Sequence, residues 1–468
     1  MDLGFKRPHI IFMEHSFFYH ALQVNEDVCI GCSHCMKSCP TEAIRVRNGK
    51  ARIYENRCVD CGECYKACPV RAVYIKQDDF EDIFQYKHRI ALVPAVFLGQ
   101  FSEDIKSSQV YSVLREIGFT HVQEIESANP IYTQAKNEYC RTHTDSKPLI
   151  STFCPAIVRL VQVKFPALVD NLILLKAPVD IVSIYMKKKL MDNGISEEDI
   201  GIFYITPCAA KIASVKSPVG EEKSAVNGVI NMDSLYNKVY KEIKKNKDSK
   251  VIQTTTHLSA DSILMSMTNG ERRVCMAKRS LSIDEIENVQ EFLERLENEE
   301  IENIDFLELR ACDQSCAGGI LTCGNRSIIS ERVHTRARKT AARERNGVIP
   351  KEKEMNEYKE YLLENISVEK VKPRSMMVLD ENISIAIEKM EKIREINNFL
   401  PQTDCCVCGA PTCHSLAEDI VMGNADMTDC VFIQRNLEMR EGMTAKESIE
   451  SMEKIWGKEK LNNYINNK

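Results

Sequence analysis

The sequence predicts a mixed α/β protein built from three successive folded regions. A cysteine run occurs twice within residues 21–78, and each copy is followed by an alternating segment typical of a short strand. Apolar strand-like runs alternate with helical patterns over residues 86–378, which predicts a larger α/β domain. A third cysteine-rich block predicts a small helical domain at residues 383–436, followed by a helical tail at residues 437–468.

The composition is that of a globular chain with an excess of cysteine. The 468 residues carry a net charge of −6, which gives no reason to expect nucleic acid as a partner. The longest mostly apolar run, Ile90–Phe101, is too short to span a bilayer. Residues 1–20 lack the basic start and apolar core of a signal peptide. We therefore expect a cytoplasmic protein without a membrane span.

The 20 cysteines are the strongest signal in the sequence, because most of them are clustered. Disulfides are rare in large cytosolic chains, so metal binding is the better interpretation. Only four cysteines fall outside the ligand sets assigned below: Cys140, Cys275, Cys323 and Cys406.

The first domain contains two runs of the form C-x₂-C-x₂-C-x₃-C-P, a spacing typical of [4Fe–4S] clusters. In two-cluster ferredoxins the fourth cysteine of a run binds the other cluster, so we assign the ligands crosswise. The two sets are Cys29, Cys32, Cys35 and Cys68, and Cys58, Cys61, Cys64 and Cys39. A pair of zinc sites is the alternative. The segments Ala43–Val46 and Ala72–Ile75 are the predicted short strands.

The large domain has five apolar runs that predict buried strands. They are Ile90–Val96, Leu149–Thr152, Ile202–Ile205, Val251–Thr255 and Ile304–Leu309. A helix is expected to begin at Ser282, because Glu285 three residues later completes a capping box. Strands that alternate with helices in this way predict a doubly wound sheet.

Three cysteine motifs follow directly after predicted strands. Ligands collect at the carboxyl ends of strands in an open α/β sheet, so we expect their thiolates to converge on one metal cluster. The four cysteines are Cys154, Cys208, Cys312 and Cys316. Gly318 and Gly319 are expected to let the backbone approach that cluster. The alternative is a set of isolated core cysteines, which are common.

These motifs resemble the catalytic core of [FeFe] hydrogenases. The matching segments are Ser151–Pro155, Thr206–Lys211 and Glu308–Gly319, and the resemblance covers roughly residues 21–330. It implies that the four cysteines bind a [4Fe–4S] cluster and that Cys316 bridges this cluster to a two-iron subcluster with CO and cyanide ligands. It also implies that Lys211 hydrogen-bonds one cyanide, and that the segment Val93, Pro94 and Ala95 contacts the other.

Four positions depart from the pattern of this family. Phe153 stands where the family has a cysteine that shuttles protons, and a phenyl ring cannot carry a proton. Thr206 and Arg310 replace methionines, and Ile320 replaces a glycine. These changes keep the ligands but remove the proton carrier, as in the divergent sensory subgroups that the sequence resembles. Cys316, Lys211 and Phe153 are therefore the expected catalytic positions of a slow or sensory [FeFe] hydrogenase, with H₂ and protons as its substrates.

The C-terminal block has the spacing C-x₂-C-x₄-C-x₁₆-C, supplied by Cys405, Cys408, Cys413 and Cys430. It resembles the [4Fe–4S] domain of the Rnf complex B subunit and of corrinoid iron–sulfur proteins, with Cys406 as a spare thiol. Zinc is the alternative metal. The preceding residues 383–399 predict an amphipathic helix.

Together the sets predict four [4Fe–4S] clusters and a redox partner such as ferredoxin or a signalling protein. The alternative function is a non-catalytic electron-transfer or assembly protein without the two-iron subcluster, a class to which the hydrogenase-like Narf proteins belong. The segment Arg332–Arg345 has six basic residues, which predicts either a patch for an acidic partner or a solvated helix face.

Overall fold

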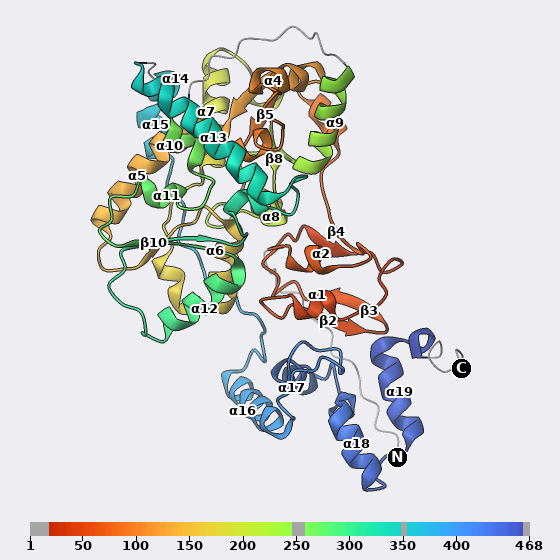
Figure 1. Cartoon of the computed structure of the whole chain (residues 1–468). Coiled ribbons are helices and arrows are strands. Elements are labelled where there is room, and N and C mark those ends of the chain that lie inside the picture. Colours follow the sequence, from red (N-terminus) through yellow and green to blue (C-terminus); the bar gives the residue numbers. More distant parts are fainter. Residues whose placement is uncertain (1–17, 246–257, 348–352, 462–468) are drawn as a thin grey trace.

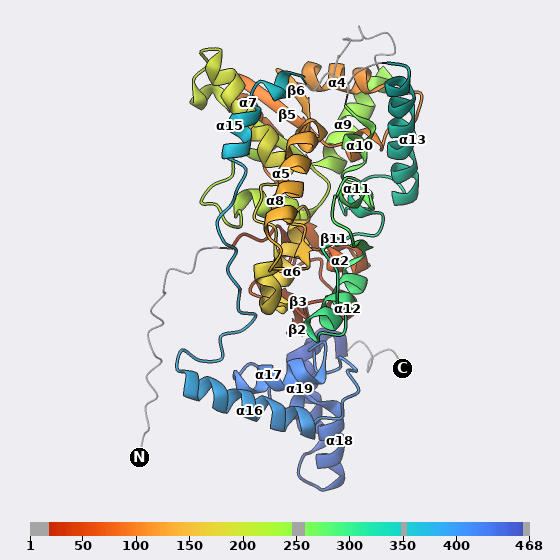
Figure 2. The same cartoon turned by 90° about the vertical axis from the view of Figure 1, so that its left-hand side faces the viewer.

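The computed structural model describes residues 18–245, 258–347 and 353–461. Its three regions follow one another along the long axis of the molecule (Figure 1). The small N-terminal domain lies between the large α/β domain and the C-terminal helices, and a quarter turn shows the same order (Figure 2). In the part of the chain that is described, no helix is both long and apolar enough to cross a membrane.

The N-terminal domain is built from two small antiparallel pairs of strands. Strand β1 (Leu22–Val24) pairs with β4 (Val73–Ile75), and β2 (Ile44–Arg47) pairs with β3 (Lys50–Ile53). The predicted short strands are thus confirmed as β2 and β4. Two single-turn helices, α1 (His34–Lys37) and α2 (Glu63–Ala67), lie inside the two cysteine runs.

The large domain contains two parallel sheets, so the prediction of one doubly wound sheet is wrong. The first sheet has the order β6-β5-β8-β9, and the second has the order β10-β11-β7. Alternation of strands and helices along a sequence does not reveal which strands pair. The strand bounds are β5 His88–Val93, β6 His121–Glu124, β7 Leu149–Ile150, β8 Ile200–Thr206, β9 Gly228–Asn231, β10 Ser280–Asp284 and β11 Phe306–Arg310.

Four of the five predicted strands are present, and Val251–Thr255 lies outside the described residues. The predicted helix start at Ser282 is wrong, because Ser282 lies in β10 and pairs with Glu308 of β11. The helix α12 begins at Ile286, after Glu285 with a φ of 74°. Parallel pairing with a buried strand therefore outweighs the local capping signal at this position.

Helices cover both sheets and connect their strands (Figure 1). The α-helices of this domain are α3 Ala95–Leu98, α4 Ser107–Glu116, α5 Asn129–Thr142, α6 Pro155–Lys164, α7 Pro178–Asp192, α8 Ala209–Lys216, α9 Met232–Lys245, α10 Ala260–Leu264, α11 Gly270–Arg273, α12 Ile286–Glu297, α13 Arg326–Arg345, α14 Lys353–Asn356 and α15 Lys359–Glu364. The short 3₁₀ helices of the chain are η1 Phe80–Gln85, η2 Ile125–Ala128, η3 Pro166–Asn171, η4 Glu197–Asp199, η5 Ser315–Gly318 and η6 Met427–Asp429.

The C-terminal region consists of α16 (Ile383–Phe399), α17 (Cys413–Val421), α18 (Val431–Met439) and α19 (Ala445–Trp456). The helix predicted over residues 383–399 is confirmed. Its apolar residues are not all buried, however: Ile393 is buried, whereas Ile383 is 78% exposed and Met390 is 51% exposed.

A polar seam joins the C-terminal region to the N-terminal domain. The Val46 amide donates a hydrogen bond to the Gly409 carbonyl (2.9 Å). Arg45 and Arg47 each form an ion pair with Asp419 (2.7 Å), and all three side chains are largely buried. Two segments more than 360 residues apart in the sequence are thereby held together.

Candidate metal centres

The first cysteine set gathers around a small, mostly apolar cavity in the N-terminal domain. Cys29, Cys32, Cys35 and Cys68 all line this cavity. Burial raises the pKa of Cys35 to about 12, and the neighbouring Cys32, Cys29 and Cys68 add to the rise. Four thiolates this close together repel each other, so their ionised form is stable only with positive charge between them. A metal cluster supplies such a charge.

The second set is assembled in the same crosswise manner. Burial raises the pKa of Cys64 well above its ordinary value, with Cys61 and Cys39 as the nearest thiols and Cys35 of the first set beyond them. Burial raises the pKa of Cys58 in the same way. The structure therefore brings Cys39 to the second run, as the crosswise assignment predicts, and places the two sets next to each other.

Backbone amides already point at several of these sulfur atoms. The Ala43 amide lies 3.2 Å from Cys39 Sγ, and the Ala72 amide lies 3.1 Å from Cys68 Sγ. Such N–H···S contacts stabilise negative charge on sulfur and are a means by which proteins set the reduction potential of a cluster.

In the large domain, the four predicted cysteines converge from three strand ends. Cys154 follows β7 and caps α6, and Cys208 follows β8 and caps α8. Cys312 and Cys316 follow β11, the latter within η5. Burial raises the pKa of Cys208 to about 12, with Cys154 and Cys316 contributing, and Cys312 interacts with the same three thiols. These cysteines are one cluster of thiols and not isolated core residues.

The two glycines beside Cys316 are required by close backbone contacts, whether or not they also let the backbone approach a cluster. A Cβ atom on Gly318 would collide with the Asp313 carbonyl, and one on Gly319 would collide with the Pro207 carbonyl. Glycine is therefore required at 318 by a tight turn within the Cys312–Cys316 loop, and at 319 by the close approach of the loop that carries Cys208.

Lys211 is partly buried beside this cluster. Burial alone lowers the pKa of Lys211, but Cys316 and Tyr204 outweigh it and raise the pKa above its ordinary value. The Lys211 ammonium lies 4.8 Å from the centre of the Phe153 ring. A permanent cation thus stands next to the cysteine that is predicted to bridge to a second group.

Phe153 has a second cation beside its ring, because the Arg310 guanidinium lies 3.9 Å from the ring centre. Arg310 is fully buried and forms an ion pair with Glu271 (2.8 Å). Cys316 and Cys154 are among the groups that raise the pKa of Arg310. Arg310 Nε and Nη1 have no hydrogen-bond partner among the described residues.

Glu271 organises a buried network that sequence analysis missed. It accepts hydrogen bonds from Ser151 Oγ (2.6 Å) and Tyr132 OH (2.9 Å), and its carboxylate lies 3.7 Å from the Lys136 ammonium. These residues are far apart in the sequence, and no local motif marks them. The only sequence signal was Arg310 itself, a charged residue at the end of an apolar strand.

The segment after β5 is positioned by a carboxylate. Pro94 caps α3, and the Ala95 amide donates a 2.6 Å hydrogen bond to Glu126. Burial raises the pKa of Glu126 to about 7. The Ala95 amide already donates to Glu126, so the predicted cyanide contact would have to involve other atoms of this segment.

The C-terminal cysteines also converge. Burial raises the pKa of Cys408 to about 12, and its neighbours include Cys405 and Cys430. Cys413 is a neighbour of Cys430. Cys406 turns away at a φ of 64°, and its thiol donates to the Pro411 carbonyl (3.2 Å). This arrangement agrees with Cys406 as the spare thiol and leaves four cysteines for one metal centre.

Comparisons with known proteins match three separate parts of the chain. Residues 87–242 match the family described as "Iron only hydrogenase large subunit, C-terminal domain". Residues 21–69 match the 4Fe-4S dicluster domain, and residues 400–432 match a family described as an Fe-S cluster. No curated protein matches the sequence.

Similar solved structures are [FeFe]-hydrogenases. One, from a study of stepwise H-cluster assembly, shares 13% identity over 64% of this chain and 97% of its own, with a TM-score of 0.48. Another, a variant of the enzyme from Chlamydomonas reinhardtii, shares 14% identity over 63% of this chain and 97% of its own, with a TM-score of 0.47.

The large domain contacts the N-terminal domain through its cysteine loops. Lys66, in the helix between Cys64 and Cys68, interacts with Cys312. Cys61 packs against the same hydrophobic cluster as Cys154 and Cys208. On its far side, the N-terminal domain meets the C-terminal block, where Ser415 and Thr412 donate to Glu42, three residues after Cys39. The cysteine sets therefore lie in three regions that contact one another in the order large domain, N-terminal domain, C-terminal region.

Proposed function

We propose that the protein is an iron–sulfur electron-transfer protein whose hydrogenase-like core turns over H₂ slowly and senses H₂ or redox state. The observation that carries this proposal is the position of Phe153 beside two cations, the partly buried Lys211 at 4.8 Å and the buried Arg310 at 3.9 Å. Fast proton transfer needs a titratable group within hydrogen-bond reach of the reacting centre. A phenyl ring at that position supplies none.

In this proposal the sixteen cysteines of the four sets each serve as a ligand of a [4Fe–4S] cluster. Electrons pass between the core and an external partner through the N-terminal and C-terminal centres. A ferredoxin or a signalling protein is the partner class we propose, in the cytoplasm. The series of adjacent cysteine sets supports this part of the proposal.

The core residues fit an anionic two-iron group as well as the [4Fe–4S] cluster. Cys316 would bridge to the group, Lys211 would donate to one cyanide, and Pro94 and Ala95 would line its other side. The unpartnered Nε and Nη1 of Arg310 would find acceptors there. When bound, this group supplies the metal at which H₂ is formed or split.

A second function is favoured by Arg310 itself. A fully buried guanidinium stands where the family pattern has a methionine, and it places a positive charge near Cys316 and Cys154, although Glu271 and Glu308 also pair with it. In this alternative the protein is a non-catalytic electron carrier or assembly protein whose core holds only the [4Fe–4S] cluster.

Infrared spectroscopy distinguishes the two functions. The protein is matured anaerobically with the two-iron cofactor, and the spectral window of bound CO and cyanide is recorded. Bands in the wild type that are absent from Cys316→Ser support the proposed function. No bands in a protein with its full complement of [4Fe–4S] iron would refute it and leave the non-catalytic alternative. Bands that persist in Cys316→Ser would show that another residue is the bridge.

A further inference from the structure

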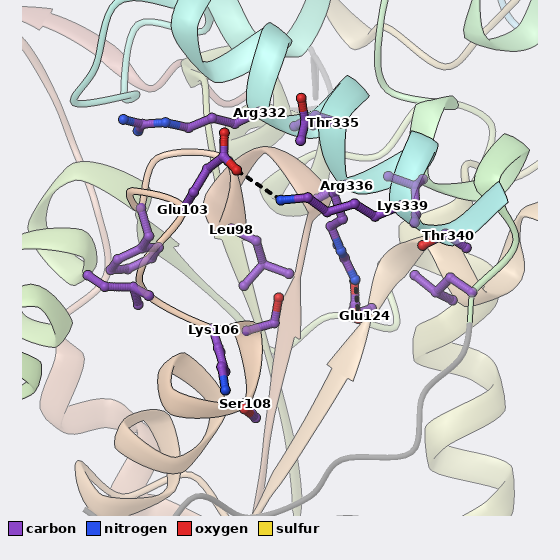
Figure 3. Close-up of a pocket in the computed structure, with 18 of the residues that line it drawn as sticks. Leu98, Glu103, Lys106, Ser108, Glu124, Arg332, Thr335, Arg336, Lys339 and Thr340 are labelled. Carbon is purple, nitrogen blue, oxygen red and sulfur yellow. Dashed lines mark hydrogen bonds and ion pairs between the residues drawn. The ribbon is translucent and has the colours of Figure 1, made fainter. Parts of the chain in front are cut away.

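The basic segment of α13 lines a cavity that is partly open to solvent, and Lys339 and Arg343 remain exposed. Arg332, Arg336, Lys339 and Arg343 recur at intervals of four, three and four residues, so they share one face of the helix. All four line a cavity of about 410 Å³ that is closed by α4, the end of α3 and the start of α10 (Figure 3). The other basic residue nearby, Arg338, pairs with Glu331 at the surface and lies outside the cavity.

The cavity carries an excess of positive charge. Its lining includes five basic and three acidic side chains. Two of the cations are neutralised: Arg336 pairs with Glu124 (2.7 Å), and Lys339 pairs with Glu103 (2.8 Å), as Figure 3 shows. The acid Glu344 accepts a hydrogen bond from the Ala260 amide. Among the described residues, Arg332, Arg343 and Lys106 form no ion pair, although Arg332 donates a hydrogen bond to the Gln100 carbonyl (3.0 Å) and helps to lower the pKa of Glu103.

Two features mark this charge as unfavourable in the free protein. One terminal nitrogen of Arg336, Nη1, is buried without an acceptor. The N-cap of α4 is Lys106, although cations are disfavoured at the positive end of a helix, and the first turn contains no acidic residue. An ammonium group cannot accept from the first-turn amides, so a bound anion would supply what this helix start lacks.

The remaining lining suits a ligand with both a phosphate and an organic part. Hydroxyl groups surround the basic wall: Ser102, Ser107, Ser108, Thr335 and Thr340. The floor is apolar and includes Leu98, Ile105 and Ile263. The volume is in the range of small-molecule sites, which is larger than inorganic phosphate requires.

We propose that this cavity binds a phosphorylated organic molecule, with its phosphate groups on Arg332, Arg343 and the start of α4. Arginine and hydroxyl donors with free helix amides form the donor set that phosphate oxygens take. The cavity floor includes Ala95 and Leu98, directly after Pro94, so such a ligand would lie against the same segment that lines the core. The proposal does not depend on whether the core turns over H₂.

Calorimetric titration of the cluster-loaded full chain tests the proposal. The probes are ATP, inorganic pyrophosphate and citrate, each at low and at high salt. We expect ATP and pyrophosphate to bind, ATP more tightly because of the apolar floor, and both to weaken as salt rises. Arg332→Gln combined with Arg343→Gln is expected to weaken binding by about tenfold per lost charged contact.

Two controls keep the result interpretable. Arg338→Gln lies on the same helix outside the cavity and should bind the probes like the wild type. Lys106→Gln changes an exposed side chain and repeats the test without touching α13. The proposal fails if neither phosphate probe binds at millimolar concentration, or if the paired arginine variant binds as well as Arg338→Gln. Citrate binding equal to that of pyrophosphate would overturn the assignment of the ligand as a phosphate.

Discussion

Replacing Glu271 by glutamine removes a buried carboxylate that contacts both Arg310 and Lys136 in the core, and leaves Arg310 with only the more distant Glu308 (3.5 Å) among the described residues. The carboxylate lies 2.8 Å from Arg310 and 3.7 Å from Lys136, and the side chains of all three are at most 2% exposed. Glutamine has the same shape, so the loss is one of charge and of hydrogen-bond acceptance from Ser151 and Tyr132. Breaking a buried ion pair from one side costs about 3–5 kcal/mol.

Anaerobic differential scanning calorimetry measures this effect. For a domain of this size, a loss of about 3–5 kcal/mol lowers Tm by roughly 10 °C. Glu138→Gln is the matched control, because Glu138 lies on α5 near Lys136 but pairs with Arg141 at the surface. It should leave Tm unchanged. A shift for Glu271→Gln no larger than that of Glu138→Gln would refute the reasoning that two buried cations depend on Glu271.

Three further outcomes follow. Anaerobic analysis should find about sixteen iron atoms per chain, or about eighteen with the two-iron group; stoichiometric zinc, or fewer than about twelve irons, would contradict the four assigned sets. Phe153→Cys should raise dye-coupled H₂ evolution by about 10²-fold in the cofactor-loaded protein, and a wild type that is already fast would exclude Phe153 as the limit on proton delivery. Asp419→Asn leaves Arg45 and Arg47 buried without their anion, so the Val46 amide should exchange hydrogen faster; unchanged exchange would show that the seam does not rely on these pairs.

The cysteine sets could be predicted from sequence because their geometry is mostly local. Ligands two residues apart reach the same cluster in any fold, and the convergence of Cys154, Cys208 and Cys312 followed from one rule about strand ends. The sheet topology was harder to predict from the sequence, because strand pairing is decided by tertiary packing. Thus Ser282 and Glu285 have the spacing of a capping box, yet Ser282 lies in a strand.

The Glu271 network could not be predicted from the sequence for a related reason. A carboxylate that pairs with two cations from distant segments has no signature in its own neighbourhood. The basic residues of α13 were seen, but sequence alone left open whether they face solvent or a partner. In the structure, Arg332 and Arg343 line a cavity together with residues of α4 and of the loop before it.

Exposure of the assigned ligands has a consequence for how electrons reach the protein. Of the sixteen assigned cysteines, all within the described residues, only Cys405 is exposed. The outer side of the N-terminal hairpin is covered, because Asn48 and Gly49 donate to the carbonyls of Lys454 and Ile455 in α19. A diffusing electron carrier would therefore come nearest to a bound cluster by docking at the C-terminal centre. The ferredoxin-type domain would then act as an internal conductor between two other centres, and not as the external terminal that its sequence suggests.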